Sequence, residues 1–212
     1  MEYDMQKWFV TLVLILIFFV CSAGCSSSSS VQPVTTPTST QIILPVQESR
    51  TATVPPSDMA LQLSDMNPDY SIKDRSVMIT PEVTQLTQDL GWRQGYFVLF
   101  YRLNKDKDDQ TFVRQSISIF PIENMNKVFT TEKEDMKSRS SGSTIFHEMP
   151  FPTIGDMSIA FRGSIDNDPY ALVVYSVIFT KKDVYEKITM TGTTTDYETF
   201  KDIAIRAAEK IR

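Results

Sequence analysis

Cysteine and histidine are nearly absent from the 212-residue chain, which contains two cysteines and one histidine. Cys21 and Cys25 both lie at the end of an apolar N-terminal run, so the rest of the chain has no cysteines for an internal disulfide or a thiolate zinc site. A Ser-His-Asp site would have to use His147, yet the nucleophile-elbow pattern G-x-S-x-G does not occur. One histidine also makes a transition-metal site unexpected.

Glycine is scarce as well, with seven in the chain, and neither G-x-G-x-x-G nor a P-loop occurs. Nucleotide phosphates would therefore lack the glycine-rich backbone that usually cradles them. The formal net charge of −5 argues against nucleic acid, because proteins that bind it concentrate positive charge. We expect no cofactor, no metal and no nucleic-acid partner.

The chain does contain a long apolar stretch near its N-terminus. The residues from Trp8 to Val20 are apolar apart from one threonine, the small residues Ser22, Ala23 and Gly24 follow, and Cys25 comes next. This arrangement is typical of a signal peptide whose cysteine is lipidated before cleavage. We therefore predict that Cys25 is the lipidated first residue of the mature protein.

A retained membrane helix from Trp8 to Gly24 is the alternative. Seventeen residues at about 1.5 Å each reach about 25 Å, which is short of a hydrocarbon core of about 30 Å. No basic stop-transfer cluster follows the run. Both interpretations place the remainder on the extracytoplasmic face of the cell membrane, so cleavage is left open here.

Composition divides the chain into three parts. Residues 1–24 are the predicted signal peptide, and residues 25–56 are rich in Ser, Thr, Pro and Gln without an apolar period. Such a segment cannot bury enough surface to offset the entropy of ordering, so we expect a disordered linker. Residues 57–212 are the predicted globular domain, long enough for a hydrophobic core of its own.

Periodicity in the domain predicts a mostly antiparallel sheet with three helices. The expected strands are Tyr70–Ile79, Gly95–Leu103, Thr111–Phe120, Thr144–Glu148, Ser158–Arg162, Tyr170–Thr180 and Val184–Thr191. The expected helices are 80–91, 121–138 and a C-terminal helix capped by Thr195 and Glu198.

Two of these strands, 95–103 and 170–180, are apolar at nearly every position, which indicates cover on both faces. The strand 111–120 alternates better. One side carries Val113, Gln115, Ile117 and Ile119, and the other carries Phe112, Arg114, Ser116 and Ser118. We therefore predict an α+β fold of about six to seven strands, arranged as an α-β-α sandwich.

The segment Pro152–Phe161 resembles the turn and strand entry of PsbP-like domains and related prokaryotic lipoproteins. The sequel 173–179, 184–192 and 200–211 is similar to the strand pair and alanine-rich last helix of those families. The layout also resembles archaeal surface lipoproteins of unassigned function. The resemblance implies a PsbP-like fold and accessory or binding work rather than catalysis.

Few residues stand out as a site. Trp92 and Tyr96 begin an aromatic cluster and form our candidate pocket. The loops 104–109 and 166–168 carry alternating oxygen ligands, but the first lacks the glycine and the final glutamate of a calcium loop. No pair of carboxylates is marked out by spacing. We name no catalytic residue.

The leading hypothesis is a non-enzymatic, lipid-anchored domain with an accessory or binding role at the cell surface, where a protein is one candidate partner. A surface hydrolase that uses His147 or a carboxylate pair is the first alternative. A structural subunit of the cell surface is the second.

Overall fold

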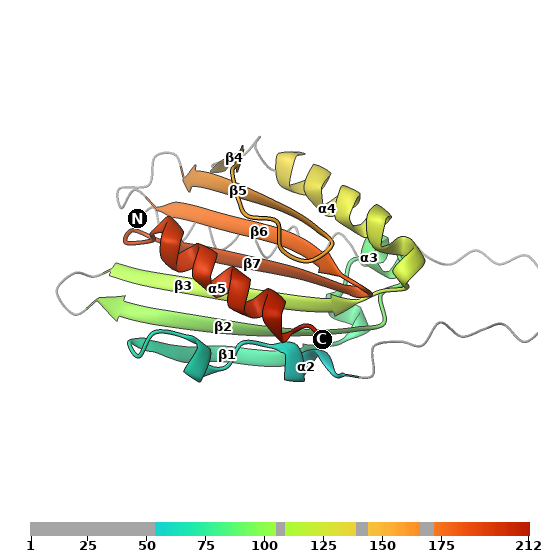
Figure 1. Ribbon diagram of the computed structural model, residues 1–212, viewed down its shortest axis with the longest axis horizontal. Coiled ribbons are helices and arrows are strands. Elements are labelled where there is room, and N and C mark those ends of the chain that lie inside the picture. The colour runs from blue at the N-terminus through green and yellow to red at the C-terminus, as the bar shows by residue number, and fades with distance from the viewer. Residues whose placement is uncertain (1–53, 105–108, 139–143, 166–171) are drawn as a thin grey trace, which may run out of the picture. The chain divides into compact units, whose positions relative to one another are not determined.

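The computed structural model describes residues 54–104, 109–138, 144–165 and 172–212 (Figure 1). The anchor and nearly all of the linker lie outside them. The strands are β1 (Tyr70–Met78), β2 (Gln94–Asn104), β3 (Asp109–Ile119), β4 (Thr144–Met149), β5 (Met157–Ile165), β6 (Val173–Lys181) and β7 (Val184–Gly192). The α-helices are α2 (Pro56–Met59), α3 (Gln85–Asp89), α4 (Met125–Ser138) and α5 (Tyr197–Lys210), and short 3-10 turns occupy Leu63–Asp65, Thr80–Glu82 and Ile122–Asn124.

All seven strands join one sheet in the order β1-β2-β3-β7-β6-β5-β4, and every neighbouring pair is antiparallel. The predicted α+β class and strand number are thereby confirmed. The described residues contain four α-helices rather than three. The additional one, α2, has only four residues, too few to leave a helical period in the sequence.

One face of the sheet packs against α5 and against the segment 54–66, which contains α2 (Figure 1). We call it the covered face. Alanines on α5 let the helix lie close to the strands, as their spacing predicts. The helix and the residue after it bury Phe200, Ile203, Ala204, Ala207, Ala208 and Ile211, and the strands contribute Val98, Phe100, Val113, Ile117, Val177, Phe179, Ile188 and Met190.

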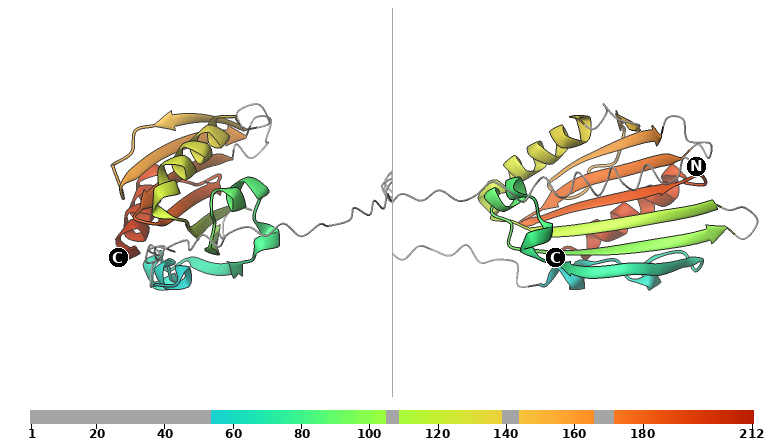
Figure 2. Two further views of the ribbon diagram at one scale, coloured as in Figure 1. Left: turned by 90° about the vertical axis from the view of Figure 1, so that its right-hand side faces the viewer. Right: turned by 180° about the vertical axis from the view of Figure 1, so that it is seen from behind.

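The opposite face carries a second, smaller core beneath α4, which contacts β4, β6 and β7 (Figure 2). Its buried side chains include Val128 and Met136 of the helix and Phe161, Ile178 and Tyr185 of the strands. Helices therefore lie on both faces of the sheet, as the sequence predicts. Their cover of the second face stops at β7.

The two strands predicted to be buried on both faces differ from each other. Strand β6 is buried at all seven inner positions, which confirms that prediction. In β2, Val98 and Phe100 are buried on the covered face, whereas Phe97 and Leu99 are half-buried on the other and Leu103 is 55% exposed. The prediction is wrong for β2, because among the described helices the main cover on that side comes from α4, which packs over β4, β6 and β7.

The N-cap of the last helix lies one residue later than expected. The Asp196 side chain accepts a hydrogen bond from the Thr199 backbone N–H (2.7 Å), so the cap is Asp196 and the predicted Thr195–Glu198 capping box is wrong. At the other end, the Lys181 ammonium donates to the Ala208 carbonyl (3.2 Å) and to that of Ile211. A cation from β6 thus stabilises the negative end of the helix.

Candidate functional site

The two aromatic residues of the predicted pocket point to opposite faces of the sheet. Trp92 packs against the core beneath α4, and its indole N–H donates to the Ser118 hydroxyl (3.3 Å). Tyr96 packs against the covered face and lines a surface pocket of about 180 Å³ together with Pro55 and Val77. The structure therefore does not bring Trp92 and Tyr96 into one site.

The single histidine lies on an edge strand. His147 is an exposed residue of β4, and its cross-strand neighbour on β5 is Arg162. This placement gives no support to a Ser-His-Asp arrangement. The loop residues 105–108 and 166–168, considered above as calcium ligands, lie outside the described residues. Among the described residues, no group of three or more His, Cys, Asp or Glu side chains could hold a metal ion.

Charged, aromatic and hydroxyl side chains lie together on a different surface, the half of the sheet that α4 leaves uncovered. We call it the open face. Four strands build it, and each contributes alternate residues because successive side chains of a strand point to opposite sides. Its side chains are Lys73, Asp74 and Ser76 of β1, Phe97, Leu99 and Tyr101 of β2, Phe112, Arg114 and Ser116 of β3, and Thr189 and Thr191 of β7.

Strand register fixes the neighbours on the open face. Arg114 lies at its centre, opposite Leu99 on one side and Thr189 on the other. Two residues along, Phe112 lies between Tyr101 and Thr191 in the same way. Aromatic rings, a guanidinium and hydroxyls therefore share one surface, and all are exposed or half-buried.

Two cations of the open face are held against aromatic rings. The Arg114 guanidinium carbon lies 4.9 Å from the Phe97 ring centroid, and the Arg114 Nε donates to the Ser116 hydroxyl (3.4 Å). The Lys73 Nζ lies 4.7 Å from the Phe112 ring centroid. Such contacts contribute about 0.5–1 kcal/mol at exposed sites, so they orient both charges without burying them.

An irregularity in β1 supplies Lys73 to this face. The pairing of β1 with β2 shifts between Ile72 and Asp74, and leaves Lys73 without a direct partner in the strand register. An extra residue of this kind bends a strand and redirects side chains, and it also protects the edge of a sheet from pairing with other strands.

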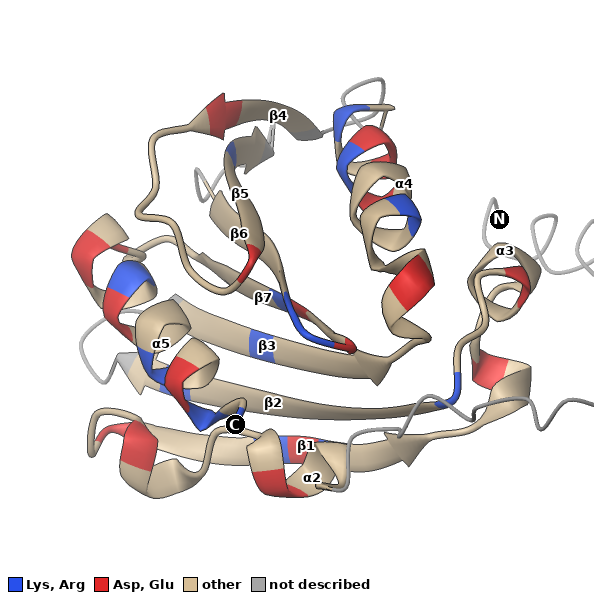
Figure 3. Ribbon diagram, turned by 45° about the vertical axis from the view of Figure 1, so that its right-hand side comes forward, with Lys and Arg blue, Asp and Glu red and all other residues tan. Residues whose placement is uncertain are grey.

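Lys73 and Arg114 differ from Arg102 and Lys210 in their partners. Arg102 pairs with Asp69 (3.6 Å), and Lys210 pairs with Asp65 (2.7 Å). Among the described residues, no carboxylate lies within 4.0 Å of the Lys73 or the Arg114 charge. Figure 3 shows that acidic residues accompany the basic ones along α4 and α5, while the strands are mostly uncharged. The open face therefore presents two cations that lie against aromatic rings and that no carboxylate of the described residues pairs within 4.0 Å.

The covered face contains an ionisable residue too, but this one is buried and neutral rather than exposed and charged. Glu186 of β7 is completely buried, and its Oε1 accepts a hydrogen bond from the Gln115 amide (2.7 Å). Gln115 in turn accepts from the Leu61 backbone N–H (2.8 Å). Burial raises the pKa of Glu186 to about 8, despite the opposing hydrogen bond from Gln115. The carboxyl is therefore protonated at neutral pH and helps to hold the segment 54–66 on the sheet.

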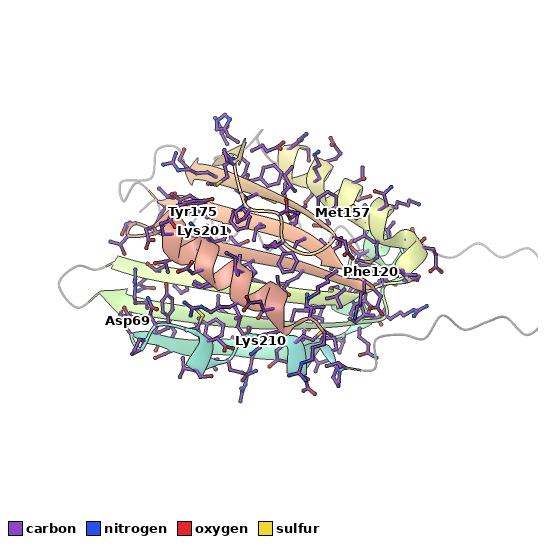
Figure 4. The ribbon with its side chains drawn as sticks, in the orientation of Figure 1. Asp69, Phe120, Met157, Tyr175, Lys201 and Lys210 are labelled. Atoms are coloured by element: carbon purple, nitrogen blue, oxygen red, sulfur yellow. The ribbon has the colours of Figure 1, made fainter. Side chains whose placement is uncertain are left out.

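The same segment is fastened to α5 by its own turn. Asp65 accepts from the Lys210 ammonium (2.7 Å) and from the Gln62 backbone N–H (2.7 Å), and the Arg206 guanidinium donates to the Asp65 carbonyl (2.6 Å). Partial burial raises the pKa of Asp65, but these hydrogen bonds and charges outweigh it and leave the pKa lowered. Figure 4 shows Lys210 at the end of α5 that lies beside this segment.

Neither set of residues is a site that the sequence predicts. The alternation of 111–120 does place Phe112, Arg114, Ser116 and Ser118 on one side of a strand, and the structure confirms it. Nothing in the sequence links Arg114 to Lys73, because they lie 41 positions apart and meet only through the register of three strands.

Comparison with known proteins yields little beyond the fold. No family model and no curated protein matches the chain. A solved structure, the extracellular domain of PknH from Mycobacterium tuberculosis, is similar with a TM-score of 0.55 and 10% sequence identity, over 73% of this chain and 93% of that one. At that identity the likeness concerns the fold alone. None of the helices in the described ranges has the length and apolar composition needed to cross a bilayer.

Proposed function

We propose that the protein is a lipid-anchored extracytoplasmic domain that binds a partner through its open face and does no catalysis. The observation that carries this proposal is the pair of ring-held cations, Lys73 and Arg114, on a sheet surface that no helix covers in the described part of the chain. Exposed charges that aromatic rings orient, and that no described carboxylate pairs, suit electrostatic recognition of another molecule.

The proposed location rests on the N-terminal residues. Trp8–Val20 is apolar, and Cys25 follows three small residues, as in signal peptides of lipidated proteins. The fold likeness to an extracellular domain agrees with this location. A PsbP-like assignment belongs to the same proposal and rests only on the resemblance of residues 152–161 and of the strand pair and last helix after them.

A photo-crosslinking experiment in the native membrane tests the binding surface. A photoreactive amino acid replaces Thr189 on the open face of the full-length protein, and Glu209 on the exposed side of α5 serves as the matched control. We expect covalent adducts from position 189 and few from position 209. Equal adduct formation at both positions, or adducts from 209 alone, would contradict the proposed surface.

The anchor has its own test. Replacing Cys25 with alanine removes the proposed lipid attachment site. The variant should therefore lack the added mass of the lipid and should no longer be recovered with the membranes as a lipidated protein. Mass spectrometry of the purified protein measures the modification directly. An unmodified N-terminus at Met1 in soluble cytosol would contradict both the lipid anchor and the extracytoplasmic location.

A further inference from the structure

We infer that the ligand of the open face is an acidic polysaccharide. The inference rests on the proposed function, since it names the class of molecule that the same surface binds. It depends on three properties of the face: the sign of its uncompensated charge, the chemistry of the side chains around that charge, and its extent.

The positive charge of the open face indicates an anionic ligand. Lys73 and Arg114 together carry two positive charges without an acid partner within 4.0 Å in the described part of the chain. Asp74 is the one acid among the face's described side chains, so these three residues leave a net positive charge. The chain as a whole has a net charge of −5, so the face is positive against an acidic background. A guanidinium binds carboxylates in a two-pronged geometry, which suits the acid groups of a sugar polymer.

The surrounding side chains match a sugar better than other anions. Tyr101 and Leu99 offer apolar surface to the C–H face of a sugar ring, and the hydroxyls of Ser116, Thr189 and Thr191 can exchange hydrogen bonds with sugar hydroxyls. A simple polyanion, such as an acidic polypeptide, would use the two cations but leave this apolar and hydroxyl surface unmatched.

The extent of the face indicates a polymer. Phe97 and Tyr101 are four residues apart on β2, about 14 Å at about 3.4 Å per residue, and the three steps from β1 to β7 span about 14 Å at about 4.8 Å per strand. That area exceeds a single sugar. The surface lies across four strands, so several consecutive sugars of an extended chain can contact it together.

Full-length protein in phosphatidylcholine nanodiscs, titrated with polygalacturonate, tests the inference. Fully methyl-esterified polygalacturonate has the same rings without the charge, and poly-L-glutamate has carboxylates without the rings. We expect polygalacturonate alone to bind. Replacing both Lys73 and Arg114 with alanine should weaken binding by roughly tenfold or more, because two charge-assisted contacts are lost. Replacing Lys201 with alanine is the matched control, because this lysine of α5 also lies over an aromatic ring but on the opposite side of the sheet, and it should leave the affinity unchanged.

Two further substitutions test the apolar part of the surface. Tyr101→Ser should weaken binding of polygalacturonate several-fold while the charges remain, and Arg114→Lys should keep the charge but lose the two-pronged geometry, with a several-fold loss. Circular dichroism checks that each variant is folded. A folded Tyr101→Ser variant with unchanged affinity would overturn the stacking role.

Each remaining outcome overturns the ligand class in a way that is separable from the proposed function. Equal binding of poly-L-glutamate would indicate an acidic protein as the partner. Protection of a Thr189→Cys label by phosphatidylglycerol in the disc would indicate an anionic bilayer. Absence of binding to every polyanion would overturn the inference, while crosslinking from position 189 in native membranes would still decide whether the face binds a partner.

Discussion

The two faces of the sheet are made by the same strands but carry different kinds of side chains. On the covered face, β2 and β3 place Phe100 and Val113 under α5 and the segment 54–66, where both are fully buried. On the open face, Phe97 and Phe112 of the same two strands hold cations at the surface instead. Because successive side chains of a strand point to opposite faces, one strand can contribute to the core on one face and to a binding surface on the other.

The charged residues of the two faces show the same contrast. Glu186 lies buried on the covered face, where it is neutral and serves packing through Gln115. Arg114 lies one strand away on the open face, where it is exposed, charged and hydrogen-bonded to a serine hydroxyl. The difference indicates that changes on one face should alter unfolding, and changes on the other should alter binding.

Truncation of neighbouring residues in β2 gives the largest expected effect. Phe100→Ala removes a fully buried ring and should lower the free energy of unfolding by about 3–5 kcal/mol. Leu99→Ala, one residue away on the open face, should cost about 1 kcal/mol, because that side chain is already partly exposed. Chemical denaturation of the full-length protein measures both. Equal losses would contradict the distinction between the faces.

The buried Glu186 carboxyl predicts a dependence of stability on pH. Its folded pKa of about 8 lies above the ordinary value of 4.5, so the unfolded chain ionises first as pH rises. The free energy of unfolding that the neutral Glu186 carboxyl contributes is complete below about pH 4.5. Between about pH 4.5 and pH 8 it falls by about 1.4 kcal/mol per pH unit, and above about pH 8 it is fully lost.

Glu186→Gln should abolish this slope, because the amide cannot ionise. The exposed Glu209→Gln on α5 provides the matched control and should leave the slope unchanged. Denaturation curves at pH 5, 6, 7 and 8 give the comparison. A Glu186→Gln variant with the slope of the unmodified protein would show that Glu186 is ionised in the folded state.

The contact between the segment 54–66 and α5 should matter less. Asp65→Asn removes the charge that accepts from Lys210, and we expect a loss of about 1–2 kcal/mol, because the pair is partly buried. Asp58→Asn, an exposed acid of the same segment, is the control. Chemical denaturation at neutral pH measures the free energy of unfolding of both variants. Identical midpoints for the two would indicate that the Asp65–Lys210 pair does not stabilise the packing of segment 54–66 against α5.

The smallest effect on stability is expected on the open face. Arg114→Ala should lower the free energy of unfolding by about 1 kcal/mol or less, since an exposed contact between a cation and a ring contributes no more. A loss comparable to that of Phe100→Ala would show that Arg114 supports the fold, and would remove the case for a surface kept for binding.

The elements of the domain were largely readable from its sequence, because long periodic runs such as 111–120 and 200–211 dictate their own faces. The prediction that failed was how much of the sheet the helices cover. The apolar run 95–103 could not reveal that no helix of the described residues would reach one of its sides. The open face was hidden for a related reason, since Lys73 reaches it only through a shift in strand pairing that leaves no mark in composition.

The central claim is that the open face serves recognition and not stability. The most direct measurement combines unfolding and crosslinking on one full-length variant, with Lys73→Ala and Arg114→Ala together and the photoreactive residue at position 189. The account predicts a domain that unfolds within about 2 kcal/mol of the unmodified protein but has lost its adduct in native membranes. Undiminished crosslinking in that folded variant would contradict it.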